Sequence, residues 1–156
     1  MMGTMTLEYI AGFLDGDGSV FFQIVKTKNI HKPFRIRSSV LFSQKTSNAV
    51  ILDKLQAFFG VGYIRHRKTG VSDYTVVDPV EVERILHSLQ PHVVLKKEHI
   101  QLGLKILERL KHVQDMHDFI ETCKLVDTFG QLNYSKKRTI TSKVVEDHFT
   151  HHLVPL

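Results

Sequence analysis

Two acidic residues, Asp15 and Asp17, lie in the glycine-rich segment DGDG that directly follows the apolar run Leu7 to Leu14. We expect that run to form a short helix capped by Thr6, which puts both carboxylates at or just past the helix C-terminus. The backbone dipole and unpaired carbonyl oxygens already make that end of a helix negative. A hard divalent cation shared by carboxylate and carbonyl oxygens would make the arrangement favourable and would suit metal-assisted hydrolysis. An ordinary Asp-Gly turn fits the same four residues.

A calcium loop of the EF-hand type is excluded for this segment. Counted from Asp15, Val20 stands where that loop needs glycine, and Lys26 stands where it needs a bidentate glutamate. The preceding helix carries the small residues Ala11 and Gly12, which would let its backbone approach another helix closely. Local packing explains small residues equally well, so their partner stays open at this point.

The hydrophobic periodicity indicates the elements that must hold these acids in place. Alternation predicts four strands, at Ser19–Val25, Arg35–Phe42, Tyr63–Arg67 and Asp73–Val77. Helical spacing predicts later helices at Ser47–Phe59, Pro79–Leu89, Lys96–Leu110, Gln114–Phe129 and Thr141–Phe149. The order is therefore α-β-β-α-β-β-α followed by more helices, and we expect the first two strands to pair. Because no linker or low-complexity tract divides the chain, we expect a single domain over residues 1–156.

Positive charge gathers in and around the first two predicted strands, supplied by Lys26, Lys28, Lys32, Arg35, Arg37 and Lys45. The chain has a formal net charge of +5, and no Asp or Glu lies between Gly18 and Leu52. Alternation turns polar side chains to the sheet face opposite the core, where arginine can pair with guanine and glutamine with adenine in a DNA major groove. The candidate DNA-contacting residues are Gln23, Thr27, Arg35, Arg37, Ser39, Arg65, Arg67, Asp73 and Thr75. A basic strand face that is merely solvated is the alternative.

A second basic cluster lies near the C-terminus, where Lys136 and Arg138 are surrounded by serine and threonine. That composition suits contacts to DNA phosphates, although solvated helix-cap charges fit it equally well. Three nearby histidines, His148, His151 and His152, fit an exposed tail better than a metal site, and we assign them no catalytic role.

The remaining composition restricts the class of protein. The lone cysteine, Cys123, excludes an internal disulfide and a cysteine-rich zinc site, and the segment FIETCKLV around it is typical of a helix core. No apolar run reaches the length of a membrane span, and the N-terminus lacks the features of a targeting peptide. We therefore expect a soluble protein with no membrane partner.

The string LEYIAGFLDGDGS, residues 7–19, resembles the motif of the LAGLIDADG homing endonucleases. Other stretches are similar to the homodimeric, intron-encoded branch that carries one motif per chain. These are SQKT at 43–46, LDKL at 52–55, GVGY at 60–63, VSDY at 71–74, LQP at 89–91 with LKK at 95–97, LN at 132–133 and SK at 135–136. The resemblance therefore covers nearly the full chain in the right order.

This resemblance implies an α+β fold with an αββαββα core, an antiparallel DNA-binding sheet and additional C-terminal helices. It implies a homodimer through the first helix that makes a double-strand break in a long, pseudo-palindromic double-stranded DNA site and promotes mobility of its intron. Mg²⁺ would be the cofactor, with Mn²⁺ as a substitute and Ca²⁺ supporting DNA binding without cleavage. The location would be an organelle, the chloroplast by resemblance.

The resemblance also assigns roles to individual residues. Asp17 would hold the metal with the Gly16 carbonyl as a second ligand, while Gln44 and Lys96 would organise water and offset charge near the scissile phosphate. Asn48 stands where related enzymes commonly have a basic residue, so either it positions water as a neutral group or the nearby Lys45 compensates. A binding module on the same scaffold, such as a splicing maturase or a transcription regulator, is the runner-up. A helical protein-interaction domain with a solvated basic face is the third alternative.

Overall fold

The computed structural model of the protein describes residues 4–133 and 138–152. Its strands are β1 (Gly18–Lys26), β2 (Phe34–Lys45), β3 (Tyr63–His66) and β4 (Val71–Val76). Its helices are α1 (Leu7–Asp17), the short 3-10 helix η1 (Thr46–Asn48), α2 (Val50–Phe59), α3 (Pro79–Leu89), α4 (Lys97–Lys111), α5 (Met116–Asp127), α6 (Phe129–Leu132) and α7 (Ser142–His152). The predicted α+β class and element order are confirmed.

The chain forms two compact units. The first contains the described residues of 1–21 and 38–104, and the second contains those of 22–37 and 105–156. Strands β1 and β2 and helix α4 contribute residues to both units. Among the described residues, no helix has both the length and the apolar character that crossing a membrane requires.

The four strands form one sheet in the order β1-β2-β4-β3. The predicted pairing of the first two strands is confirmed, while β4 lies antiparallel between β2 and β3. In this register Ser43 and Arg65 both stand opposite Asp73, so three polar residues form one row across three strands. The hairpin between β3 and β4 turns at Gly70, which has a φ of +83°, a conformation that glycine adopts at little cost.

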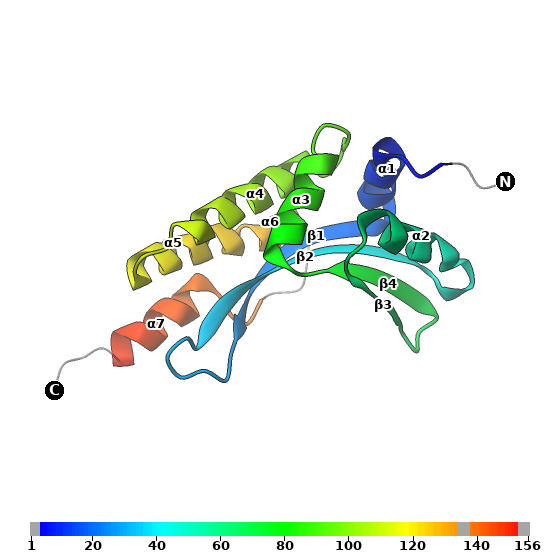
Figure 1. Ribbon diagram of the computed structural model, residues 1–156. Coiled ribbons are helices and arrows are strands. Elements are labelled where there is room, and N and C mark those ends of the chain that lie inside the picture. The colour runs from blue at the N-terminus through cyan, green and yellow to red at the C-terminus, as the bar shows by residue number, and fades with distance from the viewer. Residues whose placement is uncertain (1–3, 134–137, 153–156) are drawn as a thin grey trace. The chain divides into compact units, whose positions relative to one another are not determined.

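Helices α1, α2 and α3 lie on one side of the strands in the first unit, and α1 packs against α3 (Figure 1). The core of the first unit contains Ile10 and Leu14 of α1, which are fully buried. Phe13 lies 5.7 Å from Phe42, and Phe42 lies 6.0 Å from Tyr74, measured between ring centroids. This aromatic chain fixes α1 on the sheet and thereby fixes the helix end that carries the two acids.

The second unit has its own core around Phe22, whose ring stacks on that of Phe129 at 5.2 Å. Cys123 and Val126 of α5 are fully buried there, as the helix-core interpretation of the cysteine predicted. Phe22 shares its strand face with Val20 and Ile24, and all three are buried, which confirms the predicted alternation in β1.

Most differences from the predicted boundaries occur at element ends. The first helix reaches Asp17 rather than Leu14, so the DGDG segment is helical up to its last glycine. The helix predicted to begin at Ser47 starts with η1, and α2 itself begins at Val50. The long helix predicted to Phe129 ends at Asp127 and is followed by α6.

Candidate active site and nucleic-acid interface

Asp17 is the last residue of α1, and its side chain is exposed. Within the described part of the chain, no hydrogen bond or ion pair engages its carboxylate. The preceding Gly16 is exposed as well, and a Cβ added there would meet nothing within 4 Å outside the adjoining helix backbone. A free carboxylate beside helix C-terminal carbonyl oxygens is a donor set that fits a hard divalent cation.

Asp15 is engaged in a different way, by three consecutive backbone N–H groups. Val94 and Leu95 donate to its Oδ2 at 2.7 and 3.2 Å, and Lys96 donates to its Oδ1 at 3.0 Å. Burial alone would raise the pKa of Asp15, but these three bonds and the Lys96 charge together lower it. Asp15 is therefore a charged cap for the segment that begins α4, and its carboxylate is already engaged by protein donors.

Lys96 is brought to the same end of α1. Its Nζ donates to the Asp15 carbonyl oxygen at 3.3 Å, and its own carbonyl accepts the Ile100 N–H at 3.0 Å, so Lys96 is the N-cap of α4. The ammonium group thus lies against the turn of α1 that ends in Asp17. The predicted role of Lys96 in offsetting charge near the scissile phosphate stays a prediction.

Gln44 and Asn48 lie on the segment that leaves the sheet. Gln44 is near the end of β2, stands opposite Ser72, and accepts the Lys45 N–H on its Oε1 at 2.9 Å. Asn48 is exposed at the end of η1. No interaction among the described residues joins either side chain to Asp17 or Lys96, so their grouping with the metal ligands stays a prediction.

A charged cluster centred on Asp73 occupies the sheet face opposite that of Phe42 and Tyr74. Asp73 is 2% exposed, and its carboxylate accepts the Ser43 hydroxyl at 2.6 Å. Arg67 donates to the two Asp73 oxygens at 2.9 Å from Nε and 3.1 Å from one terminal nitrogen, and Arg65 lies at 3.5 Å. Two of the four arginines predicted to read bases on the sheet are thus held by a buried acid, while Ser43 is a partner that the sequence pattern did not indicate.

The other predicted DNA-contacting residues differ in exposure. Arg35 is exposed, Arg37 and Gln23 are half-buried, and Thr75 is 6% exposed. Ser39 is fully buried, and its hydroxyl has no partner among the described residues. Burial makes direct base contact by Ser39 unfavourable.

Two further candidates lie in the connection after β1 and in the basic C-terminal cluster, of which the structure describes only part. The Thr27 hydroxyl donates to the Lys32 carbonyl inside the β1–β2 connection. Arg138 donates to the Phe22 carbonyl at 2.5 Å, and burial lowers its pKa. Arg138 and Gln23 line one pocket of about 340 Å³ in the second unit. Lys136 lies outside the described residues.

Comparisons with known proteins all point to one family of endonucleases. The family model described as LAGLIDADG endonuclease matches residues 10–102. The chain belongs to the LAGLIDADG endonuclease family. It is 39% identical over 140 residues to the DNA endonuclease I-CreI of Chlamydomonas reinhardtii, covering 89% of this chain and 85% of that protein. It is 32% identical over 143 residues to I-CvuI of Chlorella vulgaris, covering 92% and 89%.

Solved structures agree with the family assignment. A crystal structure of the homing endonuclease I-CvuI in complex with its target, in the presence of 2 mM Ca, aligns with a TM-score of 0.88 at 31% identity, over 93% of this chain and 92% of that one. The archaeal intron-encoded homing endonuclease I-Vdi141I, complexed with DNA, aligns with a TM-score of 0.80 at 17% identity, over 93% and 94% of the two chains. The second likeness shows the fold alone, and the LAGLIDADG fold predicted from the sequence is confirmed.

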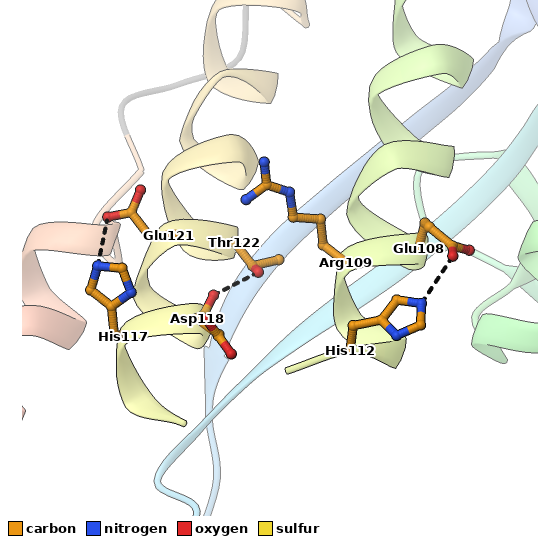
Figure 2. Close-up of a pocket in the computed structure, with 7 residues that line it drawn as sticks. All are labelled: Glu108, Arg109, His112, His117, Asp118, Glu121 and Thr122. Atoms are coloured by element: carbon orange, nitrogen blue, oxygen red, sulfur yellow. Dashed lines mark hydrogen bonds and ion pairs between the residues drawn. The ribbon is translucent and has the colours of Figure 1, made fainter. Parts of the chain in front are cut away.

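This LAGLIDADG endonuclease has a further polar pocket of about 400 Å³ in its second unit, which the sequence pattern did not indicate (Figure 2). Its lining residues come from the end of α4 and the start of α5: Glu108, Arg109, His112, His117, Asp118, Glu121 and Thr122. His112 pairs with Glu108 at 3.1 Å and His117 with Glu121 at 4.0 Å, each one helical turn apart. Such exposed local pairs are ordinary helix-surface electrostatics, and no catalytic role is assigned to them.

Proposed function

We propose that the protein is a site-specific homing endonuclease that makes a metal-dependent double-strand break in a long, pseudo-palindromic DNA site and promotes mobility of its intron. The observation that carries the proposal is the exposed, unpartnered Asp17 carboxylate at the end of α1, with Lys96 against the same helix turn. The chain is 39% identical to a DNA endonuclease, and the I-CvuI structures are complexes with target DNA. An organellar location, the chloroplast by resemblance, is part of the proposal, as is action of residues 1–156 as one endonuclease domain.

We further propose a homodimer that meets through α1. Gly12 and Gly16 lie on one exposed side of this helix with Tyr9, which is 51% exposed. Outside the adjoining backbone of α1 itself, a Cβ at either glycine would meet nothing within 4 Å, so packing within the chain does not require glycine there. A second copy of the helix would use that open backbone for close approach. Because one acidic helix end supplies half of a double-strand-cutting site, a twofold dimer completes it.

The proposed chemistry assigns one task to each residue at the acidic helix end. Asp17 and the Gly16 carbonyl would hold Mg²⁺, which when bound polarises the phosphate and stabilises the leaving oxygen. We expect Mn²⁺ to substitute and Ca²⁺ to support DNA binding without cleavage. The Lys96 ammonium would offset phosphate charge, while Gln44 and Asn48 would orient water through neutral polar groups.

The proposed DNA contacts follow from charge and exposure. Exposed arginines on the sheet would read base edges, because each can form a bidentate pair with guanine. The remaining candidates would contact bases or phosphates at the margins of the site. In full, the proposed set is Gln23, Thr27, Arg35, Arg37, Ser39, Arg65, Arg67, Asp73, Thr75, Lys136 and Arg138, with the buried Ser39 and Asp73 acting through their neighbours.

The Asp17→Asn variant tests this proposal. It keeps the shape of the side chain and removes the charge, so cleavage with Mg²⁺ should fall by about two orders of magnitude or more, whereas DNA affinity in Ca²⁺ should persist. The DNA site is first selected from a randomised library with the wild-type protein. Asp53→Asn, which removes a charge from the exposed first turn of α2, is the matched control and should cleave normally. Full cleavage by Asp17→Asn, or a wild-type protein that binds DNA but never cuts it, would contradict the proposal.

A further inference from the structure

The backbone of residues 94–96 is fixed to α1 by a carboxylate rather than by the side chains of Val94 and Leu95, although Val93 just before them is buried. Val94 and Leu95 are 80% and 71% exposed, so their side chains bury little surface that would hold the backbone in place. Their N–H groups and that of Lys96 instead converge on the Asp15 carboxylate, at distances of 2.7 to 3.2 Å. A charged acceptor with three backbone donors is a strong, directional anchor.

Asp15 and Lys96 each cap the helix that carries the other. The Asp15 carboxylate caps the N-terminal end of α4, where unpaired N–H groups and the helix dipole favour a negative charge. The Lys96 ammonium caps a carbonyl oxygen in the last turn of α1, the Asp15 carbonyl, at 3.3 Å. Each element therefore satisfies unpaired groups of the other through residues 15 and 96, whose positions differ by 81 in the sequence.

From this geometry we propose that Asp15 is a positioning residue of the cleavage site, which holds the Lys96 ammonium against the end of α1. The inference rests on the proposed function and adds to it a residue that touches neither metal nor DNA. Without the carboxylate the three N–H groups would turn to water, and the Lys96 backbone would move away from α1. A displacement of about 1 Å at such a group is enough to cost roughly 100-fold in rate.

A double-mutant cycle separates positioning from a general structural role. The variants are Asp15→Asn, Lys96→Ala and the combination, each measured by single-turnover cleavage with Mg²⁺ and by DNA affinity in Ca²⁺. We expect Asp15→Asn to slow cleavage by roughly 10- to 100-fold with affinity changed by less than about threefold. In the Lys96→Ala background the same change should slow cleavage by less than about threefold, because no ammonium is left to position. Glu8→Gln is the matched control. It also removes one carboxylate from α1, but that carboxylate lies 3.9 Å from His92 and does not accept the N–H groups of residues 94–96.

Amide hydrogen exchange on the same proteins gives a result that does not depend on cleavage. Exchange at residues 94–96 should accelerate in Asp15→Asn but not in Glu8→Gln, while the middle of α4 stays protected. The proposal is overturned if these amides remain protected, if Asp15→Asn slows cleavage equally with and without Lys96, or if Asp15→Asn does not fold at all. A wild-type protein that cuts no DNA would contradict the proposed function instead, and the exchange result would still decide whether Asp15 anchors this segment.

Discussion

Asp73 is expected to determine base preference without contacting DNA. Its carboxylate is 2% exposed and is shared between the Ser43 hydroxyl and the guanidinium of Arg67, with Arg65 at 3.5 Å. The informative perturbation is Asp73→Asn, which preserves the shape of the side chain but replaces one acceptor oxygen with an amide donor. Arg67 faces both oxygens of Asp73, so in either orientation of the amide the new donor meets a guanidinium N–H, which cannot accept a hydrogen bond.

The expected loss of stability is modest because the arginines are partly solvated. A buried hydrogen bond to a charged group contributes about 1.5–3 kcal/mol. The side chains of Arg67 and Arg65 are 41% and 65% exposed, so screening reduces each pair to about 0.2–1 kcal/mol. The hydrogen bond from the Ser43 hydroxyl adds about 1 kcal/mol, and the amide oxygen of asparagine keeps part of it. The free energy of unfolding should therefore fall by about 1–2 kcal/mol in Asp73→Asn. Urea unfolding measures this value.

The larger effect should be on DNA discrimination. An arginine that Asp73 no longer holds must be ordered when DNA binds, at a cost of about 0.5–1.5 kcal/mol. For two arginines the binding free energy for the preferred bases should weaken by about 1–3 kcal/mol, which is roughly 5- to 150-fold in affinity. Loss of one negative charge on the same face acts in the opposite direction and strengthens binding to any sequence. The ratio of affinities for the selected site and a scrambled duplex should therefore fall, most clearly at low salt.

The assay is equilibrium binding in Ca²⁺ to both duplexes at several salt concentrations, with Asp53→Asn as the control for loss of one negative charge elsewhere. In that control the affinity ratio should be unchanged. The reasoning would be refuted if Asp73→Asn changed both affinities by the same factor, because the carboxylate would then act only as a charge. Repeating library selection with the variant would show which base positions lose their preference.

Three further predictions concern stability, reactivity and assembly. Burial raises the pKa of Tyr74 to about 12, and its hydroxyl donates to the Val61 carbonyl at 2.6 Å. The contribution of this hydroxyl to stability is therefore complete below about pH 10 and is lost as the pH rises toward 12. Tyr74→Phe should lose about 1 kcal/mol at pH 8 and show a smaller alkaline decline in urea unfolding; an unchanged decline would contradict the assignment. Burial raises the pKa of the Cys123 thiol to about 12, so a thiol reagent at pH 8 should label the native protein far more slowly than the urea-unfolded chain, and equal rates would be the contrary result. Gly12→Leu should give a monomer by sedimentation without lowering the stability of the single chain, since open space surrounds that position; an intact dimer would rule out α1 as the interface.

Local signals in the sequence were sufficient where an element is stabilised by its own residues. Thr6 caps α1 through the Tyr9 N–H at 3.1 Å, as predicted. Helix α3 begins at Pro79 and ends at Leu89, as predicted, because the Asp78 side chain caps its first N–H groups and proline fixes its first turn. The alternation of β1 likewise identified its buried face, since a strand has only two faces to fill.

Long-range contacts account for what the sequence did not reveal. The placement of β4 between β2 and β3 depends on strand pairing between distant segments, which no local pattern encodes. The partners of Asp73 follow from that register, so the sequence indicated Asp73 and the arginines on one face but neither their pairing nor the contribution of Ser43. The end of α1 was placed too early at Leu14, because Asp-Gly pairs are typical of turns and the N–H groups that engage Asp15 come from residues 94–96.

The extra turn at the end of α1 explains how neighbouring acids in one motif serve different purposes. In a helix each residue turns by about 100°, so side chains two positions apart point in directions that differ by roughly 200°. Asp15 therefore faces the start of α4 and is satisfied by protein donors, whereas Asp17 points away from those donors and remains exposed. A flexible DGDG turn would impose no such separation, and either carboxylate could compete for the same N–H groups. Helical geometry up to Asp17 is thus the physical reason that one carboxylate accepts the N–H groups of residues 94–96 while the other stays exposed, as the proposed cation site requires.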